Sequence, residues 1–433
     1  HLARDSLSPS GHYVRKLGED GDKSVETSVL LHEFGVPNCD FSDEVMACLP
    51  PTSWNIKDEI KLNQNMYLHS AHGDGTGENR ATHTGKREIR KDLRHIPVVS
   101  IDPPGCKDID DALHCVELEN GNFEVGVHIA DVTYFIAPDS PLDKEAAYRS
   151  TSTYLVERRL DMLPGLLTTQ LCSLRSNEDH LAFSVIWEMD TNGNIVGEVR
   201  FSKSVIHSVA SLTYDEAQQM LDMDVDRIGI PHPELDAKCG NVEKRALVTK
   251  SVRLLNHLAI KLRNRRIDEG ALTLASTEVR FKLDAETQNP TDVTMYALKQ
   301  ANALVEEFML LANITVSKKI LRHYPTLAVL RRHQPPSKEQ LLPLVSAARA
   351  VGVELDISSS KCLADSLDSA HRVDDPYFNK LLRILSTRCM MPAQYFCSGE
   401  IPKEEWHHYG LAAPVYTHFT SPIRRYADVI VHR

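Results

Sequence analysis

The spacing of the hydrophobic residues changes part-way along the chain, and this change restricts the folds that the chain can adopt. From about residue 96, apolar runs rich in β-branched and aromatic residues predict strands, among them "IPVVSID" and "LAFSVIWEMD". The "NGN" at 192–194 predicts a hairpin. After residue 240 the apolar residues recur with a helical period, as in "QANALVEEFMLLANITVSKKIL". Strands followed by helices indicate an α+β fold.

The N-terminal part of the chain is harder to interpret. "GHYVRKLGEDGD" predicts a strand that leads into a Gly-rich turn, and residues 58–95 are predicted to be a polar linker. Within that linker, residues 61–86 contain few aliphatic side chains and predict a mobile loop. The basic run "KREIRKDLRH" is predicted to be the solvated face of a helix. Because the chain starts at a His and ends in the helical "YADVIVHR", we expect it to be a segment of a longer protein.

Composition and charge limit the classes of function. The 433 residues are 42% hydrophobic and 25% charged, as in ordinary globular proteins, and their number suggests two or more domains. No stretch has the roughly 18 apolar residues that a membrane helix requires. The nine cysteines form no CxxC pair, which argues against a zinc knuckle and favours reduced thiols in the cytosol or nucleus. A net charge of −11 disfavours non-specific coating of duplexes but permits a basic channel inside an acidic shell.

An acidic turn, "SIDPPGCKDIDDALHC", is the first candidate site. It follows an apolar strand and holds four aspartates, Asp102, Asp108, Asp110 and Asp111. The "PPGC" reversal can fold the later three back toward the first. Carboxylates this close repel each other, so the turn is either a solvated loop or a holder of metal. The pattern does not fit an EF-hand, whereas adjacent aspartates suit a pair of Mg²⁺ or Mn²⁺ ions that act in phosphoryl transfer.

A second candidate lies in "YTHFTSPIRRYADVIVHR" at the end of the chain. Ser421 as N-cap and Pro422 at the first helical position predict a helix start there. Arg424 and Arg425 would then fall in its first turns and form an anion site. Alternatively, the two arginines pair with Asp428 or other surface acids. Together, the acidic turn and the arginines suggest a phosphodiester held between metal ions and guanidinium groups.

Several blocks of the sequence resemble one known family. "DPPGCKDIDDALH", "VGVHIADVTYFI", "STYLVERRLDMLP", "LCSLRSNEDHLAFSVIWEMD", "EEFMLLAN" and "THFTSPIRRYADVIVHR" are similar, in order, to blocks of the RNB catalytic domain of the ribonuclease II family. The likeness covers residues 96–433, with the domain cut short at its C-terminus, and is nearest to the members that serve the eukaryotic RNA exosome. It implies a mixed sheet followed by a helical half. Residues 1–57 resemble the end of a second cold-shock (OB) domain and its connector.

The resemblance implies a processive, hydrolytic 3′→5′ exoribonuclease that needs magnesium and releases nucleoside 5′-monophosphates. The four family aspartates correspond to those of the acidic turn, and Asp110 is the one whose loss removes catalysis but not RNA binding. Tyr154 matches the tyrosine that stacks on RNA near its 3′ end. Arg424 matches the arginine that stabilises charge on the scissile phosphate, and Arg425 is a weaker candidate for the same role.

The resemblance also implies partners and a location. The partners are the 3′ end of single-stranded RNA and the exosome core subunits, the latter contacted through domains largely absent from this chain. We expect the nucleus and nucleolus, and also the cytoplasm. His128 and Asp131 in "HIAD" are predicted to be structural rather than catalytic, because His128 lies in a strand. Two rivals remain open: a catalytically inert RNA-binding scaffold with the same fold, and a metal-dependent phosphatase for small molecules.

Overall fold

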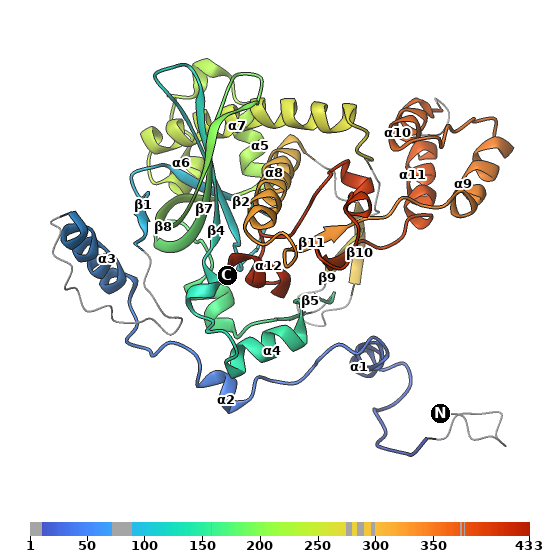
Figure 1. Cartoon of the computed structure of the whole chain (residues 1–433), viewed down its shortest axis with the longest axis horizontal. Coiled ribbons are helices and arrows are strands. Elements are labelled where there is room, and N and C mark those ends of the chain that lie inside the picture. The colour runs from blue at the N-terminus through green and yellow to red at the C-terminus, as the bar shows by residue number, and fades with distance from the viewer. Residues whose placement is uncertain are drawn as a thin grey trace.

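A six-stranded mixed sheet lies at the centre of the computed structural model (Figure 1). The structure describes residues 11–71, 89–156, 158–273, 279–283, 290–295, 299–372, 375 and 377–433. The strands are β1 (Lys91–Asp92), β2 (Val98–Asp102), β3 (Asp111–Glu117), β4 (Phe123–Ala130), β7 (Asp179–Met189) and β8 (Ile195–Thr213). Their order is β1-β8-β2-β3-β4-β7, in which β8 runs parallel to β1 and β2 and the other neighbours are antiparallel. The predicted α+β fold with a mixed sheet is therefore confirmed.

The long strand β8 joins the two sides of this sheet. Its first part pairs with β7 through the predicted "NGN" hairpin, and its last part pairs with β2. If one follows the hydrogen-bonded neighbours from β8 through β2, β3, β4 and β7, the last strand pairs with β8 again. The hairpin is fixed by Gly193 at φ +76° and by Asp190, whose carboxylate accepts from the backbone of Asn192 and Asn194.

Helices of the second half of the chain pack on one face of the sheet. They are α5 (Tyr214–Asp222), α6 (Pro233–Cys239), α7 (Val242–Asp268) and α8 (Gln300–His323). A capping box between Thr213 and Glu216 starts α5 directly at the end of β8. The fully buried Trp187, Val248 and Phe308 belong to one continuous core between strands and helices. This core holds α8 beside the strands β2 to β4.

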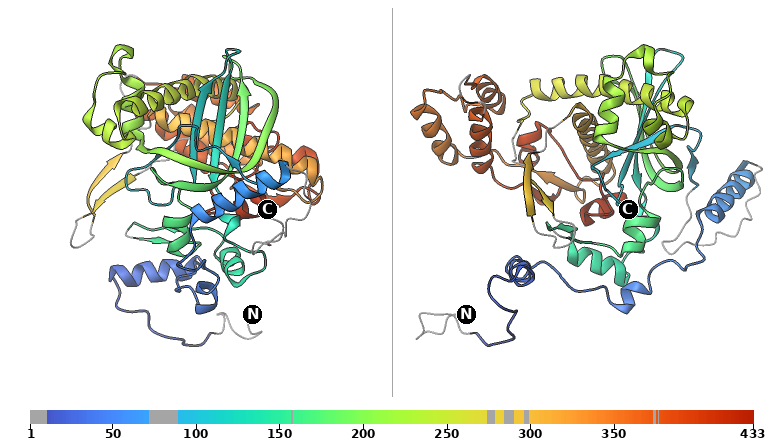
Figure 2. Two further views of the ribbon diagram at one scale, coloured as in Figure 1. Left: turned by 90° about the vertical axis from the view of Figure 1, so that its left-hand side faces the viewer. Right: turned by 180° about the vertical axis from the view of Figure 1, so that it is seen from behind.

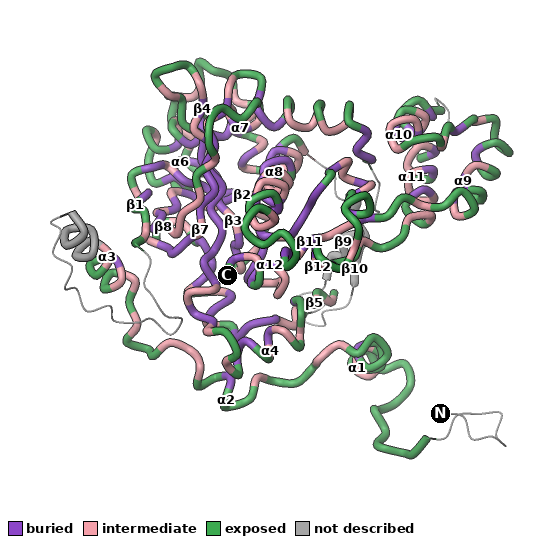
Figure 3. The backbone as a smooth tube through the Cα atoms, viewed as in Figure 1, coloured by how far each residue is buried: buried purple, intermediate pink, exposed green. Residues whose placement is uncertain are grey.

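The opposite face of the sheet carries a second core. It includes residues of α2 (Asp43–Met46), α3 (Ile56–Ala71), α4 (Pro141–Arg149) and α12 (Tyr426–His432). Alternation along the strands separates the two cores, since Val99 and Leu113 face the first and Val98 and Ala112 face the second. Figure 3 shows these strands as the most buried part of the molecule.

Smaller units complete the chain. Helices α9 (Lys338–Ala350), α10 (Ser360–Ser369) and α11 (Phe378–Arg388) form a lobe with its own apolar core, at the right of Figure 1. Three two-stranded sheets pair β5 (Thr153–Tyr154) with β6 (Arg159–Leu160), β9 (Val279–Leu283) with β10 (Pro290–Met295), and β11 (Val329–Arg332) with β12 (Gln394–Cys397).

The N-terminal segment differs from the sequence-based expectation. Residues 11–57 form α1 (Lys23–Glu33), α2 and the start of α3 and contain no strand, so the strand predicted at 11–22 is wrong and the expected cold-shock remnant is not seen there. Tyr13 and Val14 are exposed, and no strand among the described residues pairs with them. Figure 2 shows this segment running along the outside of the molecule in both views.

The predicted linker is also more regular than expected. Helix α3 occupies much of the stretch that was expected to be a loop, because Ile60 is buried in the second core and the Asn63 amide exchanges two 2.7 Å hydrogen bonds with the Arg90 backbone. Residues 72–86 of that expected loop lie outside the described residues. In the basic run, the helical prediction is wrong for the described part, where β1 joins the sheet and Leu93 is buried.

All nine cysteines are free thiols, three of them buried and the others at least partly accessible. The long helices α7 and α8 bury apolar residues against the sheet. Within the described part of the chain, none of the helices combines the length and the hydropathy that crossing a membrane would take.

Candidate active site

The acidic turn connects two neighbouring strands of the sheet. Asp102 is the last residue of β2 and Asp111 is the first residue of β3, so the pairing of these strands returns the chain to its starting point. Between them, Gly105 adopts φ +81°, a conformation that favours glycine, and the Cys106 N–H closes the turn on the Pro103 carbonyl over 3.2 Å. The reversal predicted from "PPGC" is thus present.

All four aspartates line one cavity of about 1010 Å³. Most of its wall is built from four parts of the chain: the acidic turn, the β5–β6 hairpin, helix α8 and the segment before α12. The residues that these last three parts contribute include Tyr154, Arg159, Asp161, Glu306, Asn313, Thr420, Ser421, Arg424 and Arg425. The structure therefore brings together every residue that the sequence singled out as a site candidate.

Three of these carboxyls are held in surroundings that disfavour their charge. Burial raises the pKa of Asp110 to about 8, although Arg424 opposes this shift. Burial, with repulsion from neighbouring aspartates as a smaller cause, raises the pKa of Asp102 and of Asp111 to about 7. A cation in the cavity would relieve this repulsion.

The donor set of the cavity fits a hard divalent cation. Oδ2 of Asp102 is buried without any hydrogen-bond partner, so the chain leaves one carboxylate oxygen for another species. Among the described residues, no three His, Cys or carboxylate side chains already form a metal-ligand group. Magnesium needs few protein oxygens, because it retains waters and takes further ligands from a substrate phosphate.

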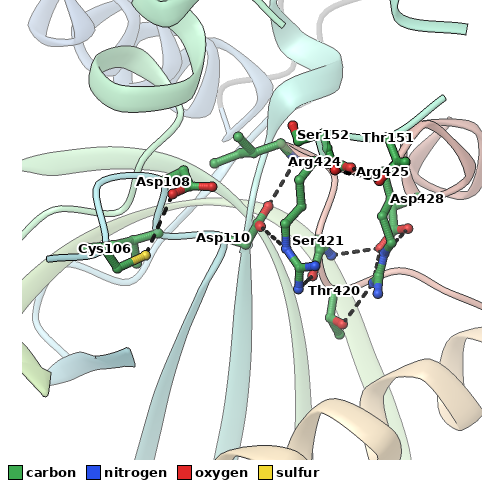
Figure 4. Close-up of polar contacts among 12 residues, drawn as sticks. Cys106, Asp108, Asp110, Thr151, Ser152, Thr420, Ser421, Arg424, Arg425 and Asp428 are labelled. Atoms are coloured by element: carbon green, nitrogen blue, oxygen red, sulfur yellow. Dashed lines mark hydrogen bonds and ion pairs between the residues drawn. The ribbon is translucent and has the colours of Figure 1, made fainter. Parts of the chain in front are cut away.

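The segment before α12 contacts Asp110 directly (Figure 4). The Ile423 N–H donates to Oδ1 of Asp110 over 2.9 Å, and Nε of Arg424 lies 3.4 Å from its Oδ2. Nη2 of Arg424 also donates to the Ser421 hydroxyl over 3.1 Å. Because 41% of the Arg424 side chain is exposed, its guanidinium can reach a phosphate in the cavity.

The predicted helix start at Ser421 is wrong. Residues 422–424 form a turn, and α12 begins only at Tyr426, after Arg425 in an extended conformation. The backbone N–H of Ser421 donates to Asp428 over 2.7 Å, and that of Ile423 donates to Asp110. These amides are therefore held by side chains, and the anion site depends on a turn rather than on a helix end.

Arg425 has a different partner from Arg424. Its Nε and Nη2 donate to the two oxygens of the fully buried Asp428, over 2.8 and 2.7 Å. Burial opposes the charge of Arg425, but the Asp428 carboxylate raises its pKa above the usual arginine value. The pairing that the sequence left open as an alternative is thus present for Arg425, which still lines the cavity.

Tyr154 lies at the rim of the cavity with 58% of its surface exposed. Its hydroxyl donates to Oδ2 of Asp108 over 3.3 Å. The strand that carries it is joined to the turn before α12, since the Ser152 N–H and the Thr151 hydroxyl both donate to the Arg424 carbonyl, over 3.0 and 2.8 Å (Figure 4). An exposed ring fixed beside carboxylates and a guanidinium is suited to stacking on a base.

A match to a family model decides the classification. The model described as "RNB domain" matches residues 90–433, which include every part of the cavity. The chain belongs to the RNB domain family.

Relatives and solved RNB structures agree with this classification. The chain is 52% identical over 430 residues to "Exosome complex exonuclease RRP44 homolog A" of Arabidopsis thaliana, which covers 99% of the chain and 41% of the relative. The chain thus spans about two fifths of the length of that relative. Its fold matches Mycoplasma genitalium RNase R in complex with ribose-methylated single-stranded RNA (TM-score 0.72, 23% identity, 96% of this chain, 57% of the other). It also matches yeast Ssd1, a pseudonuclease (TM-score 0.69, 21% identity, 99% and 47%).

In the motif "HIAD" of this RNB domain, His128 and Asp131 are buried and paired with other side chains, which supports the structural role predicted for them. His128 is fully buried in β4, where its ring nitrogens contact Nδ1 of His114 at 2.8 Å and the Ser184 hydroxyl at 2.7 Å. Burial holds the pKa of His128 well below its usual value. The Asp131 carboxylate is paired with Arg90 and Lys203. Neither side chain lines the cavity.

Sequence reasoning missed several side chains of the cavity, among them two charged residues of the β5–β6 hairpin and two polar residues of α8. Arg159 and Asp161 come from the block "STYLVERRLDMLP", in which nothing distinguishes Arg159 from its neighbour Arg158. Glu306 and Asn313 lie seven residues apart on α8 and therefore share a face. Polar residues at this spacing in an otherwise apolar helix were a signal that the sequence did contain.

Proposed function

We propose that this RNB chain is the catalytic core of a processive, hydrolytic 3′→5′ exoribonuclease that degrades single-stranded RNA to nucleoside 5′-monophosphates. The observation that carries the proposal is the single cavity in which four carboxylates meet the guanidinium of Arg424 and the exposed ring of Tyr154. The name of the Arabidopsis relative, an exonuclease, and the RNA in the RNase R complex support it.

The proposed cofactor is Mg²⁺, with Mn²⁺ as a substitute. Asp102, Asp108, Asp110 and Asp111 would hold it, and the orphan oxygen of Asp102 supports this assignment. When bound, such ions activate a water and stabilise the charge of the phosphoryl group. Since the acids repel each other in the cavity, the ions would also stabilise the folded site.

The other residues position the RNA. Tyr154 stacks on a base near the 3′ end, which grips every sequence equally. Arg424 binds the scissile phosphate and is aligned by Asp110 and Ser421. Arg425 supports the turn from its pairing with Asp428 and contributes positive potential rather than a free guanidinium.

The partner and location follow the same proposal. The relative named as a component of the exosome complex supports association with exosome core subunits, through parts of the protein other than this chain. The corresponding location is the nucleus and nucleolus, and also the cytoplasm. The rival function is a catalytically inert RNA-binding scaffold, favoured only by the likeness to the pseudonuclease Ssd1.

Degradation of a labelled single-stranded RNA tests the proposal. In magnesium we expect release of nucleoside 5′-monophosphates from the 3′ end, and in chelator none. Asp110→Asn should abolish release while RNA affinity stays within a few-fold. Glu119→Gln, an exposed carboxylate in the β3–β4 connection, is the matched control and should leave both unchanged. RNA binding without any release by the unmodified chain would favour the scaffold, and phosphate release from small esters with intact RNA would favour a phosphatase.

A further inference from the structure

The hairpin at the rim of the cavity carries two side chains that face one another. β5 and β6 are two residues long, and their antiparallel register sets Tyr154 opposite Arg159. The Leu155 N–H donates to the Arg158 carbonyl over 2.9 Å, which closes the hairpin. The bonds of Thr151 and Ser152 to the Arg424 carbonyl hold the start of this hairpin. So short a hairpin has little packing of its own, and the position of its tip depends on the side chains that anchor it.

Arg159 provides such an anchor by bridging two carboxylates. One Nη atom forms an ion pair with Asp108 of the acidic turn. Its Nε lies 2.5 Å from Oδ1 of Asp161, and its other Nη donates to Oδ2 of Asp161 over 3.3 Å. Only 22% of the guanidinium side chain and 8% of that of Asp108 are exposed, so solvent screens this pair weakly.

Asp108 is in consequence unlike the other three acids. Its two oxygens contact Arg159 on one side and the Tyr154 hydroxyl on the other. It is therefore the point at which the acidic turn meets the hairpin that carries the exposed ring.

We propose that Arg159 is a positioning residue that fixes the Tyr154 hairpin to Asp108 and so sets how far the RNA 3′ end reaches toward the acidic cluster. This inference rests on the proposed exoribonuclease function. A stacking ring retains a short RNA only if it is fixed at a constant distance from the carboxylates. Loss of the bridge lets the ring move, so short RNAs are released before their last phosphodiesters reach the site.

The test compares Arg159→Ala with Arg158→Ala. Arg158 is the adjacent arginine and is exposed. Among the described residues, its guanidinium donates to the Asn38 amide oxygen over 3.2 Å and forms no bridge to Asp108, so this control removes the same charge without the bridge. With a 5′-labelled unstructured RNA, Arg159→Ala should yield longer end products in magnesium. In chelator its RNA affinity should be about tenfold weaker, as for loss of one base stack. Arg158→Ala should match the unmodified chain in both measurements.

Two further variants keep the inference testable if Arg159→Ala unfolds. Asp161→Asn loosens the second anchor and should lengthen the end products in the same direction. Arg159→Lys retains the charge but not the two-sided bridge, and should give products of intermediate length. Thermal melting identifies any variant whose fold is lost.

Calorimetric titration of Mn²⁺ into the protein without RNA adds a measurement that does not depend on turnover. Because Arg159→Ala frees Asp108, Mn²⁺ affinity should be unchanged or higher. Lower Mn²⁺ affinity, end products of unchanged length, or an equal shift in Arg158→Ala would each overturn the inference. If the unmodified chain releases no mononucleotides, it is the proposed function that has failed.

Discussion

The backbone N–H of Ile423 donates to Oδ1 of Asp110 over 2.9 Å, and this bond joins two segments 313 residues apart. It fixes the turn of Arg424 against the acidic turn. The Asp110 carboxylate thus has a structural role beside its proposed catalytic one, and the two can be separated by substitution.

Asn and Ala at position 110 should have different effects on stability. The amide oxygen of Asp110→Asn can still accept from Ile423, so at about pH 4, below the pH range in which burial of the Asp110 carboxyl destabilises the fold, we expect a free energy of unfolding close to that of the unmodified chain. Asp110→Ala leaves a buried N–H without an acceptor and should lower it by about 1–3 kcal/mol. Urea denaturation of both variants measures this. Equal stability of the two would show that the bond contributes nothing.

Without metal, the acidic cluster should make the fold less stable as the pH rises. In the unfolded chain Asp110 loses its proton near the ordinary aspartate pKa of 3.8, whereas in the fold burial raises its pKa to about 8. Its contribution to the free energy of unfolding is therefore lost progressively between about pH 4 and pH 8, and Asp102 and Asp111 act in the same sense up to about pH 7.

The pH effect is best measured as the difference in the free energy of unfolding between Asp110→Asn and the unmodified chain. Buried histidines such as His128 have lowered pKa values and destabilise the fold as the pH falls, which opposes the carboxyl effect. We therefore expect Asp110→Asn to gain stability relative to the unmodified chain between pH 5 and about pH 8 in chelator. Denaturation curves at several pH values give this difference, and saturating Mg²⁺ should reduce it. A difference that does not change with pH would contradict the assigned burial.

The sequence was a better guide to which residues meet in the cavity than to the local backbone geometry that holds them there. The acidic turn was predictable because a strand, a Gly-containing reversal and a second strand must bring Asp102 and Asp111 together. The start of α12 was not, since its cap signals at Ser421 and Pro422 are typical of a helix while the amides are held by Asp428 and by the distant Asp110.

The anchor of the hairpin was also beyond sequence reasoning. Arg158 and Arg159 are equivalent in composition and charge, and only the register of β5 with β6 turns Arg159 toward Asp108. Helix α3 was missed for a related reason, because contacts of Ile60 and Asn63 with distant residues stabilise a segment of weak helical pattern.

Gly126→Ala should test the structural interpretation of His128. A Cβ at position 126 would overlap the ring of His114, which is paired with His128. We expect a loss of about 1–3 kcal/mol in the free energy of unfolding, as for other overpacked cores. In the His114→Ala variant the overlapping ring is absent, so adding Gly126→Ala to it should lower the free energy of unfolding by less than Gly126→Ala does in the unmodified chain. If Gly126→Ala left stability unchanged but removed activity, His128 would need a catalytic explanation.

The ring and the hydroxyl of Tyr154 should contribute differently to RNA binding. Tyr154→Ala removes the stacking surface and should weaken single-stranded RNA binding by about 1–3 kcal/mol and change the length of the final product. Tyr154→Phe removes only the exposed 3.3 Å contact with Asp108 and should leave affinity within a few-fold. Fluorescence anisotropy in chelator measures both. Equal losses would assign the binding to the hydroxyl instead.

Asp428 should be essential for the turn that carries Arg424. It is fully buried, holds Arg425 through two bonds and accepts from the Ser421 N–H. Asp428→Ala leaves a largely buried guanidinium unpaired and should lower the free energy of unfolding by about 3–5 kcal/mol. In Asp428→Ala/Arg425→Met no unpaired charge remains, so urea denaturation should show part of the stability restored. RNA cleavage should stay low in the double variant, because the Ser421 N–H still lacks its acceptor and Arg424 loses its alignment. Full activity in that variant would show that Arg424 does not depend on the turn for its position.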